Sequence, residues 1–239
     1  MGEKVLVTFD VDGTIIDCPD GGKNHIIAIN LAANELYGTP KDINMEEYIG
    51  HSFVGTTDYW IVERIVEKAK GQASVSPEEC LKFLELEYQY YLKLGCGEFV
   101  ALPGVKKTLE TLNSMPNVTV SLSTGNYDKI AWKKIEHAGV LDLFKERIGG
   151  FGHILERSDI LRFARKQAEE LRGFKFDRHV HIGDAIQDVR AAQDANAVPV
   201  AVETGSKKKA DFPQPCFVIP NLEKGFDEFI NIVKTGKPN

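Results

Sequence analysis

Short apolar runs alternate with longer amphipathic segments along most of this chain of 239 residues. The runs most typical of buried strands span 4–9, 118–123, 178–182 and 198–202, and 216–219 is a fifth candidate. Segments with helical periodicity lie between them, at 104–115, 127–138, 158–172 and 185–195. Strands that alternate with helices of this length form βαβ units around a parallel sheet. The sequence therefore predicts an α/β fold.

Residues 18–97 interrupt this alternation. They show helical patterns at 25–37, 58–69 and 77–94 and no convincing strand. Pro77, followed by two glutamates, is a favourable start for the third of these helices. The chain is also long for one ordinary domain. We therefore predict a core formed by residues 1–17 and 98–239, with an all-helical module, residues 18–97, inserted after the first strand.

The overall charge argues against a nucleic-acid partner. The formal net charge is -6 and the pI is about 5.6, whereas phosphate backbones are bound by clustered Lys and Arg. The one basic run, at 207–209, predicts a solvated loop or a small rim that attracts an anionic substrate. No leader pattern and no apolar run of membrane-spanning length is present, and the four cysteines lack metal or redox spacing. We expect a soluble cytoplasmic protein without a membrane partner.

Polar side chains follow three of the predicted strands. Asp10 and Asp12 end the first strand, Thr124 and Gly125 end the second, and Asp184 and Asp188 follow the third. In an open parallel sheet, ligands bind just beyond the carboxyl ends of the strands. The sequence therefore predicts a binding site at this edge.

Four of these side chains are carboxylates. We expect Asp184 at the N-cap of its helix and Asp188 one turn later, on the same face as Asp184. With Asp10 and Asp12 they would form an acidic cluster that repels itself unless a cation neutralises it. Hard oxygen ligands suit Mg²⁺, so we predict a magnesium site formed by Asp10, Asp12, Asp184 and Asp188.

The remaining groups suit a phosphoryl ligand. The hydroxyl of Thr124, the backbone amide of Gly125 and the guanidinium of Arg157 can each hold phosphoryl oxygens. Of the neighbouring carboxylates Asp10 and Asp12, one can attack an electrophile while the other transfers a proton at the leaving group.

Three motifs together resemble the haloacid dehalogenase-like hydrolase superfamily. They are "FDVDGT" at 9–14, "SLSTGN" at 121–126 and "GDAIQD" at 183–188. The likeness is to its phosphatase branch with a helical cap, of the phosphoglycolate phosphatase type. It implies a Rossmann-like sheet with helices on both faces and a cap at 18–97. It further implies Asp10 as nucleophile, Asp12 as general acid and base, Thr124 as a phosphate ligand and Asp184 as a metal ligand.

The chain departs from the family at its third motif, which is usually a lysine. The matching stretch here reads "ERSDIL", and Arg157 is our candidate for the replacement, with Lys129, Lys133 and Lys175 as alternatives. The segment 50–58, with two threonines and a histidine, either faces the substrate or only connects two helices.

The leading hypothesis is a Mg²⁺-dependent phosphatase that hydrolyses a small phosphorylated metabolite through an aspartyl-phosphate. A phosphosugar mutase of the same superfamily is the alternative within enzymes. A non-catalytic, phosphate-binding regulatory module is the alternative outside them. The sequence leaves the substrate and the oligomeric state open.

Overall fold

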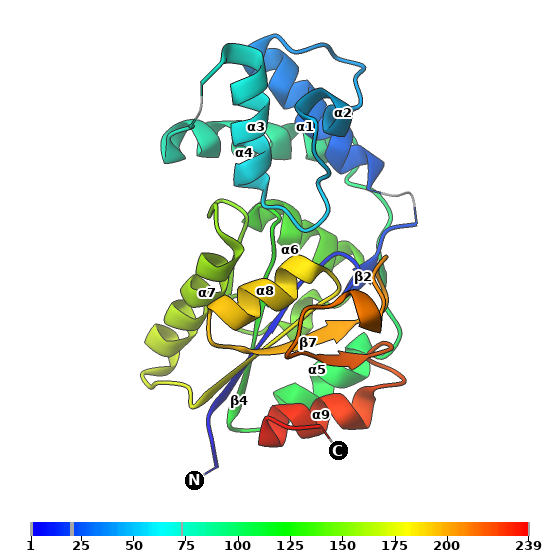
Figure 1. Ribbon diagram of the computed structural model, residues 1–239, viewed down its shortest axis with the longest axis vertical. Helices are drawn as coiled ribbons and strands as arrows, with labels where there is room; N and C mark the ends of the chain where they lie inside the picture. Colours follow the sequence, from blue (N-terminus) through cyan, green and yellow to red (C-terminus); the bar gives the residue numbers. More distant parts are fainter. Residues whose placement is uncertain (1, 20–21, 73, 239) are drawn as a thin grey trace.

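A six-stranded sheet forms the centre of the computed structural model, which describes residues 2–19, 22–72 and 74–238 (Figure 1). Its strand order is β5-β4-β1-β6-β7-β8, and every neighbouring pair is parallel. The bounds are β1 Val5–Phe9, β4 Val118–Ser123, β5 Gly149–Gly150, β6 Arg178–Gly183, β7 Val198–Val202 and β8 Phe217–Ile219. This arrangement confirms the predicted parallel α/β fold.

Helices cover both faces of this sheet. Their bounds are α5 Val105–Asn113, α6 Asp128–His137, α7 Arg157–Arg172, α8 Ile186–Asp194 and α9 Phe226–Thr235. Every residue of β1 is buried, and successive side chains point to opposite faces. Leu6 accordingly packs with Ala168 of α7, whereas Phe9 meets Phe229 of α9 on the other face, with ring centroids 6.1 Å apart. Apolar contact on both faces fixes β1, and hence the residues at its end, in the middle of the core.

Four helices form a separate layer at one end of the molecule (Figure 1). They are α1 Lys23–Tyr37, α2 Met45–Ile49, α3 Asp58–Lys70 and α4 Pro77–Lys93. Within 18–97, the described residues contain helices and no strand, while residues 20, 21 and 73 of the predicted insert lie outside the described set. The chain leaves and re-enters the sheet-containing part through two short strands, β2 Ile16–Asp17 and β3 Val100–Ala101, which pair antiparallel.

Several elements differ from the sequence prediction. The five-residue α2 is too short to show a helical period, and β5 consists of two glycines with no apolar signal. Helix α9, although strongly amphipathic, was not predicted. The expected N-cap at Asp184 was wrong by one residue, because Ala185 occupies that position and Asp184 lies before it.

Among the described residues, no helix combines the length and the apolar character needed to cross a lipid bilayer.

Candidate active site

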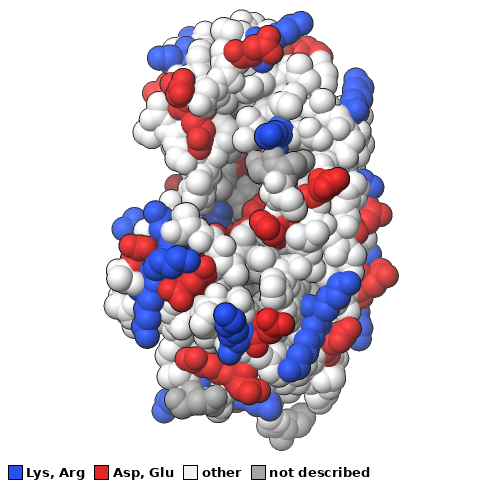
Figure 2. Space-filling model, turned by 90° about the vertical axis from the view of Figure 1, so that its right-hand side faces the viewer, with Lys and Arg blue, Asp and Glu red and all other residues white. Residues whose placement is uncertain are grey.

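A cavity of about 400 Å³ lies between the carboxyl ends of the strands and the helical layer. Figure 2 shows the surface hollowed between the two parts of the molecule, with acidic and basic side chains mixed over this face. All seven residues proposed from the sequence belong to this region, and six of them line the cavity itself: Asp10, Asp12, Thr124, Gly125, Arg157 and Asp184. Asp188 lies just behind them and contacts Arg157.

The end of β1 and the turn that follows it position the two aspartates of the first motif, Asp10 and Asp12. The Asp10 amide still donates to Ile182 of β6 at 2.9 Å, so Asp10 keeps the extended geometry of the sheet. The chain then turns through Gly13, whose φ of 73° lies in the left-handed region that favours glycine. A Cβ on Gly13 would lie 2.6 Å from the nearer carboxylate oxygen of Asp184. The turn therefore brings the backbone close against a carboxylate from the third motif.

Asp10, Asp184 and Asp188 form what we call the sheet cluster. Their nearest carboxylate oxygens all lie within 4.8 Å of one another. Burial raises the pKa of Asp10 well above its usual range, and the Asp188 charge raises it further. Burial, followed by the same neighbour, raises the pKa of Asp184 to about 7. Since a divalent cation would favour the ionised form of both, this all-oxygen donor set fits Mg²⁺.

Arg157 is the cation beside this cluster. It is the first residue of α7, and its guanidinium Nη2 lies 3.3 Å from Asp10 Oδ1 and also contacts Asp188. Burial alone would raise the pKa of Asp188, but the Arg157 charge, together with His181 and the Ala185 amide, outweighs burial and holds that pKa below its ordinary value. Nη1 donates to the carbonyl of Thr56 at 3.3 Å. Arg157 therefore stands beside the predicted nucleophile, in reach of a group bound there.

Thr124 and Gly125 form the adjoining wall. Thr124 is buried directly after β4, and its hydroxyl lies 2.9 Å from the Asn126 side-chain nitrogen, which donates to it. A Cβ on Gly125 would lie 2.0 Å from the Thr56 carbonyl oxygen. This position accepts only glycine, because the helical layer touches the core backbone here.

Asp12 faces a lysine that the sequence analysis missed. Lys134 Nζ contacts both Asp12 carboxylate oxygens, at 2.9 and 3.0 Å, and donates to Asn126 Oδ1 at 2.7 Å. Burial opposes ionisation of Asp12, but Lys134, together with the hydrogen bond from Asn126 and the nearby His25, outweighs burial and lowers the pKa of Asp12. Lys134 is only 4% exposed and lies on the buried face of α6 beside Ile130 and Ala131. The sequence did contain one indication of this role, because Lys134 occupies a position that the helical pattern of α6 reserves for apolar residues.

The three alternative lysines lie elsewhere. Lys129 pairs with Glu85, Lys133 with Glu136 and Lys175 with Glu169, and none of the three lines the cavity. Of the candidates weighed for the third motif, Arg157 alone contacts Asp10 within the described part of the chain.

The segment 50–58 both connects α2 to α3 and contributes to the cavity. Thr56 and Asp58 line it, whereas Thr57 caps α3 by accepting from the Trp60 amide at 3.1 Å. His51 instead packs against Trp60, with ring centroids 5.4 Å apart.

Fold and cavity together define an enzyme of the parallel α/β class, with a carboxylate centre at the strand ends beneath helices. The sequence model of the haloacid dehalogenase-like hydrolase family matches residues 5–196, and the chain belongs to this family. This match, together with the relatives described next, confirms the prediction of a phosphatase of this family.

Individual relatives agree with this placement. A phosphoglycolate phosphatase of Psychrobacter arcticus is 27% identical over 97% of this chain and 95% of its own length. One of Pseudomonas savastanoi is 28% identical over 92% of this chain and 77% of its own length. The crystal structure of a β-phosphoglucomutase from Clostridium difficile matches with a TM-score of 0.65 at 21% identity, over 99% of this chain and 98% of that one. At that identity the structural match supports the fold alone.

Proposed function

We propose that this protein is a Mg²⁺-dependent phosphatase that hydrolyses a small phosphorylated metabolite through an aspartyl-phosphate on Asp10. The observation that carries the proposal is the position of Asp10, which lines a covered cavity beside the Arg157 guanidinium and within the sheet cluster. Asp10 is 7% exposed and held by β6, so its carboxylate is oriented before substrate arrives.

Asp10, Asp184 and Asp188 would hold Mg²⁺, which when bound supplies positive charge that offsets the carboxylates and the phosphoryl oxygens. Asp12 as a fourth carboxylate ligand stays a prediction, since its side chain is engaged by Lys134. Arg157, the Thr124 hydroxyl and the Gly125 amide bind the equatorial oxygens of the phosphoryl group. Most of the catalysis of phosphoryl transfer resides in such positioning and charge stabilisation.

Asp12 performs the proton transfers in this scheme. After Asp10 attacks phosphorus, Asp12 gives a proton to the departing alcohol, and it then takes one from the water that attacks the aspartyl-phosphate. The Lys134 contact keeps Asp12 ionised in the free enzyme, which suits the second step. For the first step a phosphoryl group bound nearby raises the pKa of Asp12, because like charges disfavour the ionised form.

In this proposal, residues 1–17 and 98–239 form the catalytic core and residues 18–97 the cap. The cap covers the cavity through Phe53, Thr56 and Asp58, and so excludes bulk water from the aspartyl-phosphate. A cytoplasmic location stays a prediction.

The experiment is a comparison of wild type with Asp10→Asn on p-nitrophenyl phosphate, with and without Mg²⁺. Asn keeps the size of the side chain but is a far poorer nucleophile, so we expect loss of at least about 10³-fold in kcat. Chelation of divalent ions should abolish wild-type activity, and added Mg²⁺ should restore it. Asp17→Asn, an exposed position just beyond the motif, is the matched control and should retain activity. Mg²⁺-dependent turnover retained by Asp10→Asn would refute the assignment.

A further inference from the structure

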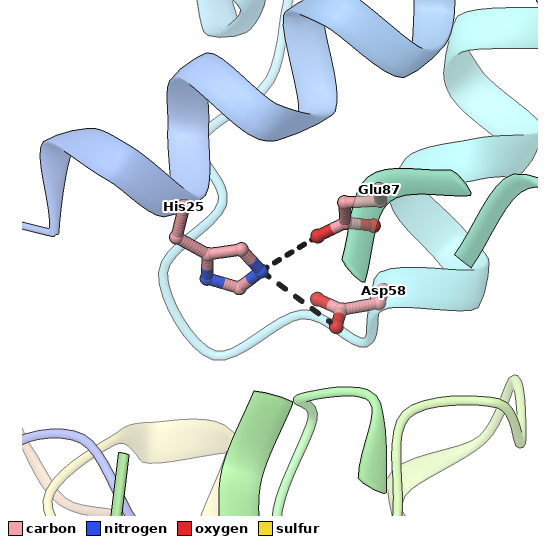
Figure 3. A group of neighbouring side chains, drawn as sticks. All are labelled: His25, Asp58 and Glu87. Carbon is pink, nitrogen blue, oxygen red and sulfur yellow. Dashed lines mark hydrogen bonds and ion pairs between the residues drawn. The ribbon is translucent and has the colours of Figure 1, made fainter. Parts of the chain in front are cut away.

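A second polar cluster faces the cavity from the helical side. His25 of α1, Asp58 of α3 and Glu87 of α4 point toward one another (Figure 3), and we call them the cap cluster. His25 Nε2 lies 2.8 Å from Glu87 Oε1 and 4.0 Å from Asp58 Oδ2. His25 and Asp58 line the same cavity as Asp10 and Asp12, while Glu87 lies behind His25. The cap cluster thus lies across the cavity from the proposed phosphoryl site.

Burial makes these carboxylates costly unless they meet a donor or a cation. Glu87 is only 1% exposed, and burial followed by the Asp58 charge raises the pKa of Glu87 well above its usual range. Burial likewise raises the pKa of Asp58 to about 7. Asp58 Oδ2 accepts from the Tyr127 amide at 2.5 Å, but its other oxygen accepts no hydrogen bond from the described part of the chain. One carboxylate oxygen therefore remains for a ligand.

The cations that line the cavity belong to the core, and one of them, Lys134, is near enough to lower the pKa of Asp58. Among the described residues that line the cavity, the helical layer contributes no Lys or Arg. Lys134 and Arg157 come from the sheet side, and each already contacts carboxylates there. A leaving group that ended in a carboxylate would find no free cation near the helices and would face Asp58. A leaving group that ended in a cation would find an acceptor and a negative charge.

The walls around the cap cluster are apolar. Ile26, Ile29, Ile61 and Phe53 line the same side of the cavity. They suit a short carbon chain between the phosphate ester and a single polar end. The cavity of about 400 Å³ must also hold the phosphoryl group, so that chain is short.

We propose that Asp58 and His25, supported by Glu87, bind the leaving group of the substrate, and that this group is a short alcohol carrying a positively charged amine. This inference rests on the proposed phosphatase function and names its substrate class. An ammonium group donates hydrogen bonds to the Asp58 carboxylate and to the imidazole of His25. Glu87 acts as a positioning residue that holds the ring of His25 toward the cavity.

Three esters with two-carbon leaving groups test the proposal, because they differ mainly at the far end. They are 2-aminoethyl phosphate, 2-hydroxyethyl phosphate and 2-phosphoglycolate, which end in an ammonium, a hydroxyl and a carboxylate. We expect wild type to have the highest kcat/KM on 2-aminoethyl phosphate, about 10- to 100-fold above 2-phosphoglycolate, as one charge-assisted hydrogen bond implies. An equal or higher value on either other ester would overturn the proposal.

Asp58→Asn removes the carboxylate proposed to bind the ammonium, and Glu87→Gln replaces the carboxyl group that holds the His25 ring. Both variants keep an oxygen that can accept the existing hydrogen bonds. Each should lower the ratio of kcat/KM for 2-aminoethyl phosphate over 2-phosphoglycolate by about tenfold or more. Glu85→Gln, a half-exposed position on the same helix as Glu87, is the matched control and should leave the ratio unchanged. An unchanged ratio in both cluster variants would contradict the proposal, because residues with a purely structural role would affect both substrates equally.

Inhibition of the wild-type enzyme supplies a test that needs no variant. Ethanolamine should inhibit hydrolysis of p-nitrophenyl phosphate at lower concentration than glycolate does, and the reverse order would count against the proposal. The proposed phosphatase function and the inference of an amine substrate can be refuted separately. Absence of p-nitrophenyl phosphate hydrolysis by wild type would defeat the proposed function itself, whereas hydrolysis with a preference for 2-phosphoglycolate would defeat the amine inference alone.

Discussion

Two clusters of buried carboxylates face one cavity, and they differ in what compensates their charge. The sheet cluster has a permanent cation, Arg157, which contacts Asp10 and Asp188. The cap cluster contains no such cation: its one basic member is His25, and burial lowers the pKa of that imidazole to about 3, so it stays neutral. Arg157 therefore helps to hold Asp188 ionised before substrate binds, whereas the cap cluster gains a full counter-charge only from a ligand.

The two clusters also differ in their backbone support. The sheet cluster lies at the ends of β1 and β6, where Gly13 brings the chain close to Asp184. The cap cluster joins three helices, and at the start of α3 the Thr57 hydroxyl and the Asp58 amide donate to the core carbonyls of Leu155 and Gly125. Catalysis needs groups that rigid elements hold in fixed geometry, so we assign catalysis to the sheet cluster. We assign recognition of the leaving group to the cap cluster.

The largest effect expected among the variants below comes from Arg157→Lys. A lysine supplies a point charge in place of a planar fork, so it cannot reproduce the contacts that the two guanidinium nitrogens of Arg157 make with Asp10, Asp188 and the Thr56 carbonyl. We expect kcat/KM for p-nitrophenyl phosphate to fall about 10- to 100-fold, measured at saturating Mg²⁺. Arg165→Lys, which alters a pair with Glu169 on the same helix, should have no such effect. Full activity in Arg157→Lys would show that the sheet cluster needs only a positive charge at this position and not the planar guanidinium of Arg157.

A smaller effect is expected when pH is varied and substrate preference is measured. Asp58 is neutral below its pKa of about 7 and negative above it, so its attraction for an ammonium increases as pH rises. The ratio of kcat/KM for 2-aminoethyl phosphate over 2-hydroxyethyl phosphate should rise about three- to tenfold between about pH 6 and pH 8. Taking a ratio cancels titrations common to both reactions.

Other charged or titratable groups act on Asp58 from the elements around it. They are His25 on α1, Glu87 on α4, Lys134 on α6, Arg157 on α7 and Asp12 after β1. Asp58→Asn should flatten the rise in this ratio. A rise that persists in that variant would assign the pH dependence to one of the other groups and weaken the contrast between the clusters.

The smallest expected effect concerns the link between the clusters. The Thr57 hydroxyl caps α3 and donates to the Leu155 carbonyl at 3.0 Å, across the boundary between helical layer and core. Thr57→Ala should lower the free energy of unfolding by about 1–2 kcal/mol in urea and also raise KM for 2-aminoethyl phosphate. Ser76→Ala removes the cap of α4, where the Glu79 amide is 3.1 Å away, and should cost about 1 kcal/mol without changing KM. Equal KM values in the two variants would argue that Thr57 does not align the clusters.

Sequence patterns predicted the sheet cluster well and the cap cluster poorly, for a physical reason. Asp10 and Asp184 follow apolar strands, and the carboxyl ends of parallel strands meet at one edge whatever the loops do. His25, Asp58 and Glu87 lie on three helices whose packing angles no local pattern specifies. Lys134 was missed because its apolar neighbours made α6 look like an ordinary amphipathic helix. Only the tertiary structure shows that Lys134 meets Asp12.

In the proposed mechanism, Asp10 carries the phosphoryl group during turnover. Asp12→Asn offers the most direct measurement, because p-nitrophenolate leaves without a proton while attack of water on the intermediate still requires a base. Wild type, Asp12→Asn and Asp10→Asn would each be mixed with p-nitrophenyl phosphate and Mg²⁺, quenched in acid and digested for mass spectrometry. If Asp10 is the nucleophile, the peptide containing residue 10 gains one phosphoryl group in Asp12→Asn and none in Asp10→Asn. Release of p-nitrophenolate by Asp12→Asn with no phosphoryl group on Asp10 would contradict this mechanism.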